Sequence, residues 1–127
     1  MTLDETIDLL TAAAAFDRRT VGETDAVAWH AAVGDLRFED CQAAVIAHYT
    51  GSTDWLMPAH VRQRVREMRD RRLRETKVPP PPRELLDNPA AYQAALHAAT
   101  VAIADGRDPQ QAMTAVTRQA RRELGAS

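Results

Sequence analysis

Val78-Pro79-Pro80-Pro81-Pro82 is the stretch that divides this chain into its parts. Four consecutive prolines end regular structure and favour the extended polyproline II helix, which rises about 3.1 Å per residue. The run therefore predicts a semi-rigid spacer of roughly 12 Å. We expect a helical domain over residues 1–77, a spacer over 78–83 and a helical hairpin over 84–127.

The first third of the chain has the pattern of two short helices. The first begins with the capping-box pair Thr2 and Glu5, and apolar residues then recur at helical period. The second begins with the same spacing at Thr20 and Glu23. Gly34 stands where a glycine commonly ends a helix, so it predicts the end of this second helix.

Two further helices are expected before the spacer. One runs from about residue 35 or 37 to Gly51, and the other from Pro58 to about residue 76, because proline is tolerated in the first turn of a helix. The expected inner faces are Phe38, Cys41, Val45 and either His48 or Tyr49 in the third helix, and Val61, Val65 and Met68 in the fourth.

The region after the spacer reads as two capped helices. Asn88-Pro89 and Asp108-Pro109 each place a capping residue before a first-turn proline, and Gly106 separates the two helices. The expected apolar stripes are Tyr92, Leu96, Ala99 and Ile103 in the first helix, and Met113, Val116, Ala120 and Leu124 in the second. Two alanine-rich helices bury little surface, so we expect the hairpin to dock on the front domain, on a second copy or on a partner.

Composition supports an all-α protein: it is rich in alanine and arginine, has five glycines and has two residues each of Trp, Tyr and Phe. The lone Cys41 excludes an internal disulfide, fits a reducing compartment, and is expected to be a small buried apolar residue. No apolar run approaches the ~20 residues that span a bilayer. We expect a cytoplasmic protein with no membrane contact.

No set of residues has the spacing of a catalytic or cofactor site. His30, Cys41, His48 and His60 lack the short paired spacing of zinc ligands, and no nucleophile–base pattern or phosphate-binding glycine loop is present. We therefore expect no enzyme, no metal and no cofactor.

Charge is segregated along the chain. Residues 1–57 hold ten acidic and three basic residues, whereas 58–77 hold eight basic and three acidic residues. The basic helix is either a surface for nucleic-acid phosphates or an acidic partner, or a solvated helix whose arginine stems cover the edges of its apolar stripe. The candidate binding residues are Arg62, Arg64, Arg66, Arg69, Arg71 and Arg72.

Trp55 has two interpretations. It lies between the third and fourth expected helices, where a large side chain can cover the core. The alternative is an exposed aromatic anchor for a partner.

Several segments of the front domain occur in an order typical of one phage family. They are residues 16–23 (Phe-Asp-Arg-Arg-Thr-Val-Gly-Glu), Ala28-Trp29, residues 34–40, His48-Tyr49 and residues 55–62, followed by the arginine-rich helix. Over residues 1–76 the chain resembles small actinobacteriophage and prophage proteins similar to phage helicase loaders, of the loader-and-inhibitor, replisome-organiser type.

The resemblance implies a helical N-terminal domain, a variable C-terminal segment and a role in DNA replication. Such proteins bind the hexameric DnaB-type replicative helicase, restrain its ATPase and deliver it to an origin-bound initiator. Helicase contact would then fall on the segment after Pro82, which in this chain has the pattern of two capped helices. The candidate contacts are Tyr92, Leu96, Ile103, Met113 and Val116.

Two alternatives remain beside the helicase-loader-like adaptor. The first is a nucleic-acid-binding accessory protein that uses the basic helix over residues 58–76. The second is a scaffold protein in which the C-terminal hairpins of two copies form a four-helix bundle, and thus a homo-oligomer.

Overall fold

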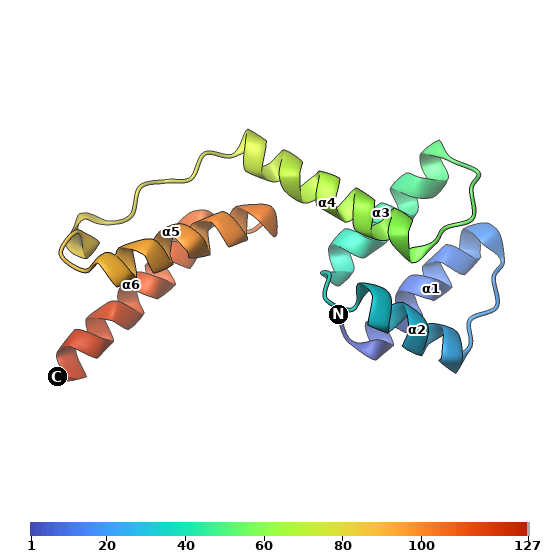
Figure 1. Cartoon of the computed structure of the whole chain (residues 1–127), viewed down its shortest axis with the longest axis horizontal. Coiled ribbons are helices and arrows are strands. Elements are labelled where there is room, and N and C mark those ends of the chain that lie inside the picture. The colour runs from blue at the N-terminus through green and yellow to red at the C-terminus, as the bar shows by residue number, and fades with distance from the viewer. Residues whose placement is uncertain (127) are drawn as a thin grey trace. The chain divides into compact units, whose positions relative to one another are not determined.

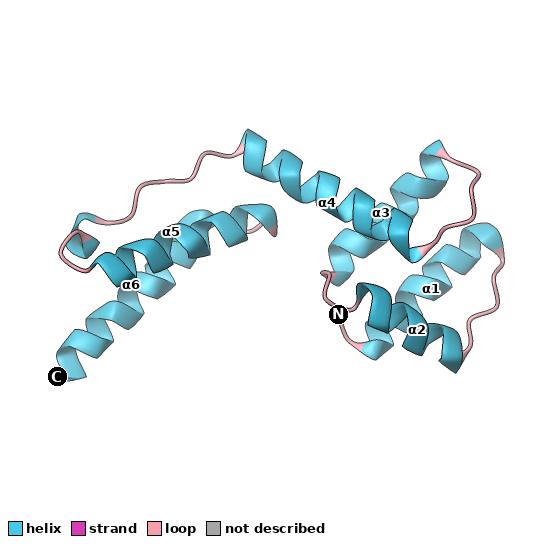
Figure 2. Ribbon diagram, viewed as in Figure 1, coloured by secondary structure: helices cyan, strands magenta, loops and turns pink. Residues whose placement is uncertain are grey.

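The computed structural model describes residues 1–126, and within that range the chain is all-helical with no strand (Figures 1 and 2). The elements in chain order are α1 (Leu3–Asp17), α2 (Glu23–Val33), α3 (Phe38–Gly51), α4 (Pro58–Glu75), the short 3₁₀ helix η1 (Arg83–Leu85), α5 (Pro89–Ala104) and α6 (Pro109–Ala126). The predicted fold class is confirmed.

The chain forms two compact units, Met1–Met68 and Arg69–Ser127. This division differs from the expected boundary after residue 77, because the last turns of α4 make their contacts in the second unit. There Arg69 forms an ion pair with Asp105, and Arg72 Nη1 donates to the carbonyl oxygen of Ala104 at 2.8 Å. These arginines lie beside the C-terminal end of α5, where a helix favours positive charge.

The front unit, residues 1–68, is built around one apolar core. Helix α1 packs against both α2 and α3, and the first half of α4 contributes Val61 and Val65, as their spacing predicted. The loop before α4 adds the fully buried Leu56. The buried core consists of Leu9, Ala13, Val33, Cys41, Ala44, Val45, Leu56, Val61 and Val65.

The start of α1 is confirmed in detail. The Glu5 amide donates to Thr2 Oγ1 at 3.1 Å, and the Thr2 amide donates to Glu5 Oε1 at 2.8 Å. Both partners of the capping box are thus present, and they satisfy two amides that the helix itself leaves unpaired.

The predicted capping box at Thr20 and Glu23 is wrong. Helix α2 begins at Glu23, and the cap is Gly22, whose amide donates to Asp25 Oδ2 at 3.1 Å. Gly34 ends α2 as predicted, but in a right-handed conformation (φ −62°). Its missing side chain matters because a Cβ there would lie 2.4 Å from the carbonyl oxygen of His30.

In the second unit, α5 packs along α6 and η1 packs on α5. The start of α5 is capped as predicted, with the Ala91 amide donating to Asn88 Oδ1 at 3.2 Å. Gly106 has a φ of 72°, which favours glycine and ends the α5 region. The buried core of the second unit contains Leu85, Ala95, Ala99, Met113 and Ala120. Residues 77–82 form no regular element, as expected of the proline spacer.

Candidate partner-binding surfaces

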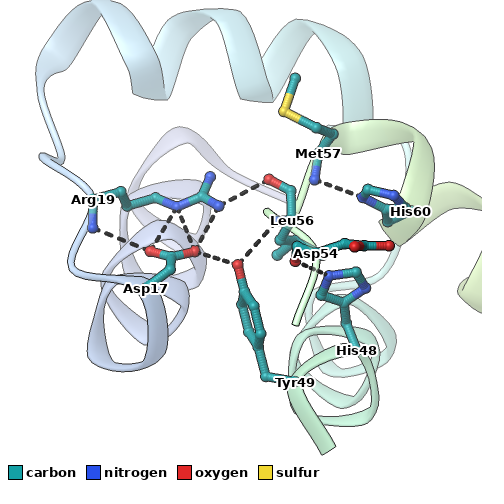
Figure 3. Close-up of polar contacts among 8 residues, drawn as sticks. All are labelled: Asp17, Arg19, His48, Tyr49, Asp54, Leu56, Met57 and His60. Carbon is teal, nitrogen blue, oxygen red and sulfur yellow. Dashed lines mark hydrogen bonds and ion pairs between the residues drawn. The ribbon is translucent and has the colours of Figure 1, made fainter. Parts of the chain in front are cut away.

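The buried side chain of Arg19 pairs with Asp17 at the end of α1 and joins the α1–α2 loop to the α3–α4 loop in the front unit (Figure 3). Arg19 Nη2 lies 2.7 Å from Asp17 Oδ2, and the side chains are only 8% and 6% exposed. The same Nη2 donates to the carbonyl oxygen of Leu56 at 2.8 Å. One guanidinium therefore ties two loops that are 37 residues apart in sequence.

Tyr49 on α3 completes this network, as Figure 3 shows. Its hydroxyl donates to Asp17 Oδ2 at 2.6 Å and accepts the Leu56 amide at 2.9 Å. Burial alone would raise the pKa of Asp17, but the hydrogen bonds from Arg19 and Tyr49 outweigh it, so that the pKa lies below its ordinary value. We call these four residues, Asp17, Arg19, Tyr49 and Leu56, the loop clamp.

Trp55 lies on the outer side of the loop clamp. The Arg19 Cζ is 4.4 Å from the centroid of the Trp55 ring and 5.3 Å from that of Trp29, which are cation–π distances. Trp55 is nevertheless 52% exposed, and Met57 beside it is 49% exposed. Trp55 thus combines parts of both interpretations: one part of the ring stacks on Arg19 and the rest faces outward. A hollow of about 390 Å³ adjoins it, lined by Leu10, Arg19, Thr20, Asp25, Trp29, Trp55 and Met57.

Two histidines hold the other side of the same loop (Figure 3). His48 is buried and its Nε2 lies 2.6 Å from the carbonyl oxygen of Asp54, so this nitrogen must donate. His60 Nδ1 accepts the Met57 amide at 2.9 Å, and the two imidazole rings lie 4.7 Å apart. These histidines therefore support the path of residues 52–57 on the side away from Arg19.

Cys41 lies in the front-unit core, as its small apolar character predicted. It is fully buried, and this burial, followed by the nearby Asp40 carboxylate, raises the pKa of its thiol to about 12. The thiol is therefore protonated and unreactive at neutral pH.

The six candidate arginines of α4 do not form one basic surface. Arg62 pairs with Asp35 at 2.7 Å, and Arg69 and Arg72 make the contacts in the second unit described above. Within residues 1–126 the ion pairs of α4 leave out Arg64, Arg66 and Arg71. At about 100° per residue, Arg64 and Arg66 lie on opposite sides of the helix.

The candidate contacts of the hairpin lie mostly inward. Ile103 and Met113 are 2% and 1% exposed, so they are packing residues of the hairpin in this structure. Tyr92, Leu96 and Val116 are partly buried and pack against its core. The structure thus brings the five residues together, but they pack mainly inside the hairpin and contribute little to its surface.

The exposed apolar residues of the hairpin are different ones. Leu86 is 65% exposed and Leu124 is 71% exposed. Arg121 Nε donates to Glu84 Oε2 at 2.7 Å, which links η1 to the last turns of α6. Leu86 directly follows η1, and Leu124 lies three residues after Arg121. We call this part of the hairpin the leucine end, defined by Leu86 and Leu124.

Comparison with known proteins gives no relative on which to rest a function: no family model, curated protein or solved structure matches this chain. Over residues 1–126, no group of three or more His, Cys, Asp or Glu side chains has the arrangement of a metal site. None of the helices described is long and apolar enough to cross a membrane.

Proposed function

We propose that this chain is a phage or prophage DNA-replication accessory protein, a non-enzymatic adaptor that binds the hexameric replicative helicase and recruits or restrains it. The chain's resemblance to helicase loaders motivates this function. The position of the resembling segments in the folded front unit supports the proposal.

Three of the five segments that carry the resemblance meet in the loop clamp. Asp17 and Arg19 come from the 16–23 segment, Tyr49 from the His48-Tyr49 pair and Leu56 from the 55–62 segment. Residues that are scattered in sequence but meet in one buried hydrogen-bonded network are those that a shared fold would retain. These contacts between distant segments support the proposal by giving the motif residues a shared structural role.

The leucine end is the surface that we assign to the helicase. Leu86 and Leu124 are both mostly exposed and offer apolar surface that a partner would cover. An exposed ion pair, Glu84 with Arg121, lies beside them and provides the polar border that partner-binding patches commonly have. The front unit then remains for a second partner, such as the origin-bound initiator that the resemblance implies.

The direct test mixes the full-length chain with a purified DnaB-type helicase hexamer from an actinobacterial host and measures complex mass by mass photometry. The chain should bind, and the double variant Leu86→Glu/Leu124→Glu should bind at least tenfold more weakly, a loss of about 1.4 kcal/mol or more. Val27→Glu is the matched control, because Val27 on α2 is 55% exposed and lies far along the chain from the leucine end.

The outcomes distinguish an error in the proposed function from an error in the assigned contact surface. If the unmodified chain does not bind the hexamer, the proposed function is wrong. If the double variant binds as well as the control, the function stands but the leucine end is not the contact.

Nucleic-acid binding through α4 is the second candidate function, favoured by the +5 net charge of residues 58–77. Ion pairing weakens it, because three of the six candidate arginines are already engaged. If only Arg64, Arg66 and Arg71 contact phosphates, log K should fall with log salt at a slope of about −2.7, from ~0.9 per contact. Fluorescence anisotropy with a labelled duplex at several salt concentrations measures this slope, and a value near −5 would mean that all six contribute.

A further inference from the structure

One face of the hairpin carries a groove along its length. A hollow of about 460 Å³ lies toward the α5–α6 loop, and another of about 260 Å³ lies toward the opposite end. On α5 both hollows are lined by residues at helical spacing, Ala90, Ala94, Ala98 and Val101. On α6 they are lined by Ala112 and Val116, one turn apart. The two hollows therefore belong to the same face, because residues four apart on a helix share one side.

The core on the inner side of this face is small. Three of its five buried residues are alanines, namely Ala95, Ala99 and Ala120. Helical units of about 40 residues usually need a disulfide, a metal or association with another chain to be stable. Val101 remains 39% exposed at the groove, although it is the largest apolar residue on that side of α5. The face thus has the small side chains that allow another helix to approach closely, and apolar surface left to bury.

Both ends of the groove carry charged side chains. The hollow near the α5–α6 loop is lined by Arg107 and by two carboxylates, Asp108 and the Asp105 that pairs with Arg69, and Glu123 lines the hollow at the other end. Arg107 and Glu123 are exposed, and Glu123 Oε1 accepts a hydrogen bond from the exposed Gln119 Nε2 at 3.3 Å. If a second hairpin lies on the face in the antiparallel direction, Arg107 of each copy meets Glu123 of the other. Such self-complementarity is what a two-fold interface requires.

We infer that two copies of this chain associate through this groove, face to face and antiparallel, so that their hairpins form a four-helix bundle. This inference goes beyond helicase binding and does not depend on it, because the leucine end lies at the end of the hairpin and outside the groove lining. Association would bury Val101 and Val116 of both copies against each other's α5 and α6.

The expected strength follows from the size of the face. Helix α5 has 16 residues and is therefore about 24 Å long. With a width of two helices, about 20 Å, the face offers roughly 500 Å² per copy, or about 1,000 Å² in total. This area is at the lower limit of specific interfaces, so the dimer should be weak, with a Kd in the micromolar range.

Sedimentation velocity of the full-length chain between about 1 and 200 µM tests the inference. The sedimentation coefficient should rise with concentration toward that of a dimer. Val101→Glu should abolish the rise, and Arg107→Glu and Glu123→Arg should each raise the Kd at least tenfold. The double variant Arg107→Glu/Glu123→Arg should restore association, because the pairs are re-formed with the charges exchanged.

Exchanging the charges of Arg107 and Glu123 tests the antiparallel arrangement specifically. Arg107 and Glu123 are exposed, so their variants should keep the helical circular dichroism of the parent chain. A monomer at all concentrations, or single charge variants that associate like the parent, would overturn the inference. Loss of association without restoration in the double variant would overturn the antiparallel arrangement.

Discussion

The two units bury their helices in different ways. The front unit has mainly leucine and valine in its core, and the buried Arg19, paired with Asp17, connects its loops through the Leu56 carbonyl. The hairpin has a core in which alanine predominates, and its ion pair between Glu84 and Arg121 lies on the surface, with side chains 41% and 65% exposed. The front unit thus has a buried polar network in addition to its apolar core, whereas the hairpin has a smaller, alanine-rich core and an exposed ion pair.

This difference has an energetic consequence. Burying a leucine in place of an alanine adds about three carbon groups, each worth about 0.8 kcal/mol. Two leucines and four valines are among the nine buried residues of the front core, whereas three of the five buried residues of the hairpin core are alanines. We therefore expect the front unit to be the more stable, and the chain to unfold in two transitions.

The largest expected effect is on the loop clamp. Arg19→Ala leaves the buried carboxylate of Asp17 without its cation and should lower the free energy of unfolding of the front unit by about 3–5 kcal/mol. Tryptophan fluorescence in urea measures this unit alone, because Trp29 and Trp55 both lie in it. Arg121→Ala is the matched control and should leave that transition unchanged. A small effect of Arg19→Ala would mean that the apolar core, and not the clamp, fixes the loops.

The second largest effect on stability is expected in the core of the hairpin. Met113 is 1% exposed, and Met113→Ala should cost about 2–4 kcal/mol, which is enough to unfold a unit of this size. Circular dichroism should lose the helical signal of the hairpin while the tryptophan fluorescence transition stays unchanged. If the fluorescence transition moves with it, the two units are not independent.

The stability of the front unit should depend on pH through Asp17. The pKa of Asp17 is lower in the folded than in the unfolded chain, so the unfolded chain binds the proton first. The stabilisation is complete above the ordinary value of 3.8 and is lost as the pH falls below it. Fluorescence-monitored unfolding from pH 7 to 2 should show this loss in the parent chain. The dependence should be smaller in Asp17→Asn, and an equal dependence would assign it to other carboxylates.

The smallest expected effects come from the helix caps, one in each unit. Thr2→Ala in α1 and Asn88→Ala in α5 each remove one side-chain acceptor and should cost about 1 kcal/mol. The loss should fall on the fluorescence transition for Thr2 and on the circular dichroism transition for Asn88. Effects on the opposite transitions would contradict the division at residues 68 and 69.

The local parts of the fold were predictable from the sequence. Capping residues, first-turn prolines and apolar spacing act within a few residues, and they predicted the six helices with the correct order and nearly correct ends. The failures are of two kinds. The cap of α2 lies at Gly22 and not at Thr20, because Asp25, and not Glu23, accepts the amide of the capping residue. Helix η1 has three residues, too few to show a period.

The surfaces were less predictable because they depend on distant residues. Tyr49 and Asp17 are 32 residues apart, and Arg62 and Asp35 are 27 apart. The number of arginines in a helix does not show which of them form ion pairs with carboxylates. An apolar stripe likewise does not show which of its residues another helix buries. The exposed Leu86 and the clamp residue Arg19 both lie outside the predicted helical stripes, so no periodic signal indicated them.

Hydrogen exchange on the full-length chain, with and without a replicative helicase hexamer, tests the division of roles most directly. In the free chain, the amides of α1 to α3 should exchange more slowly than those of α5 and α6. On addition of the hexamer, protection should increase at residues 83–90 and 118–126 and not in the front unit. Increased protection in residues 52–66 instead, or no change anywhere, would contradict the assignment of helicase binding to the leucine end.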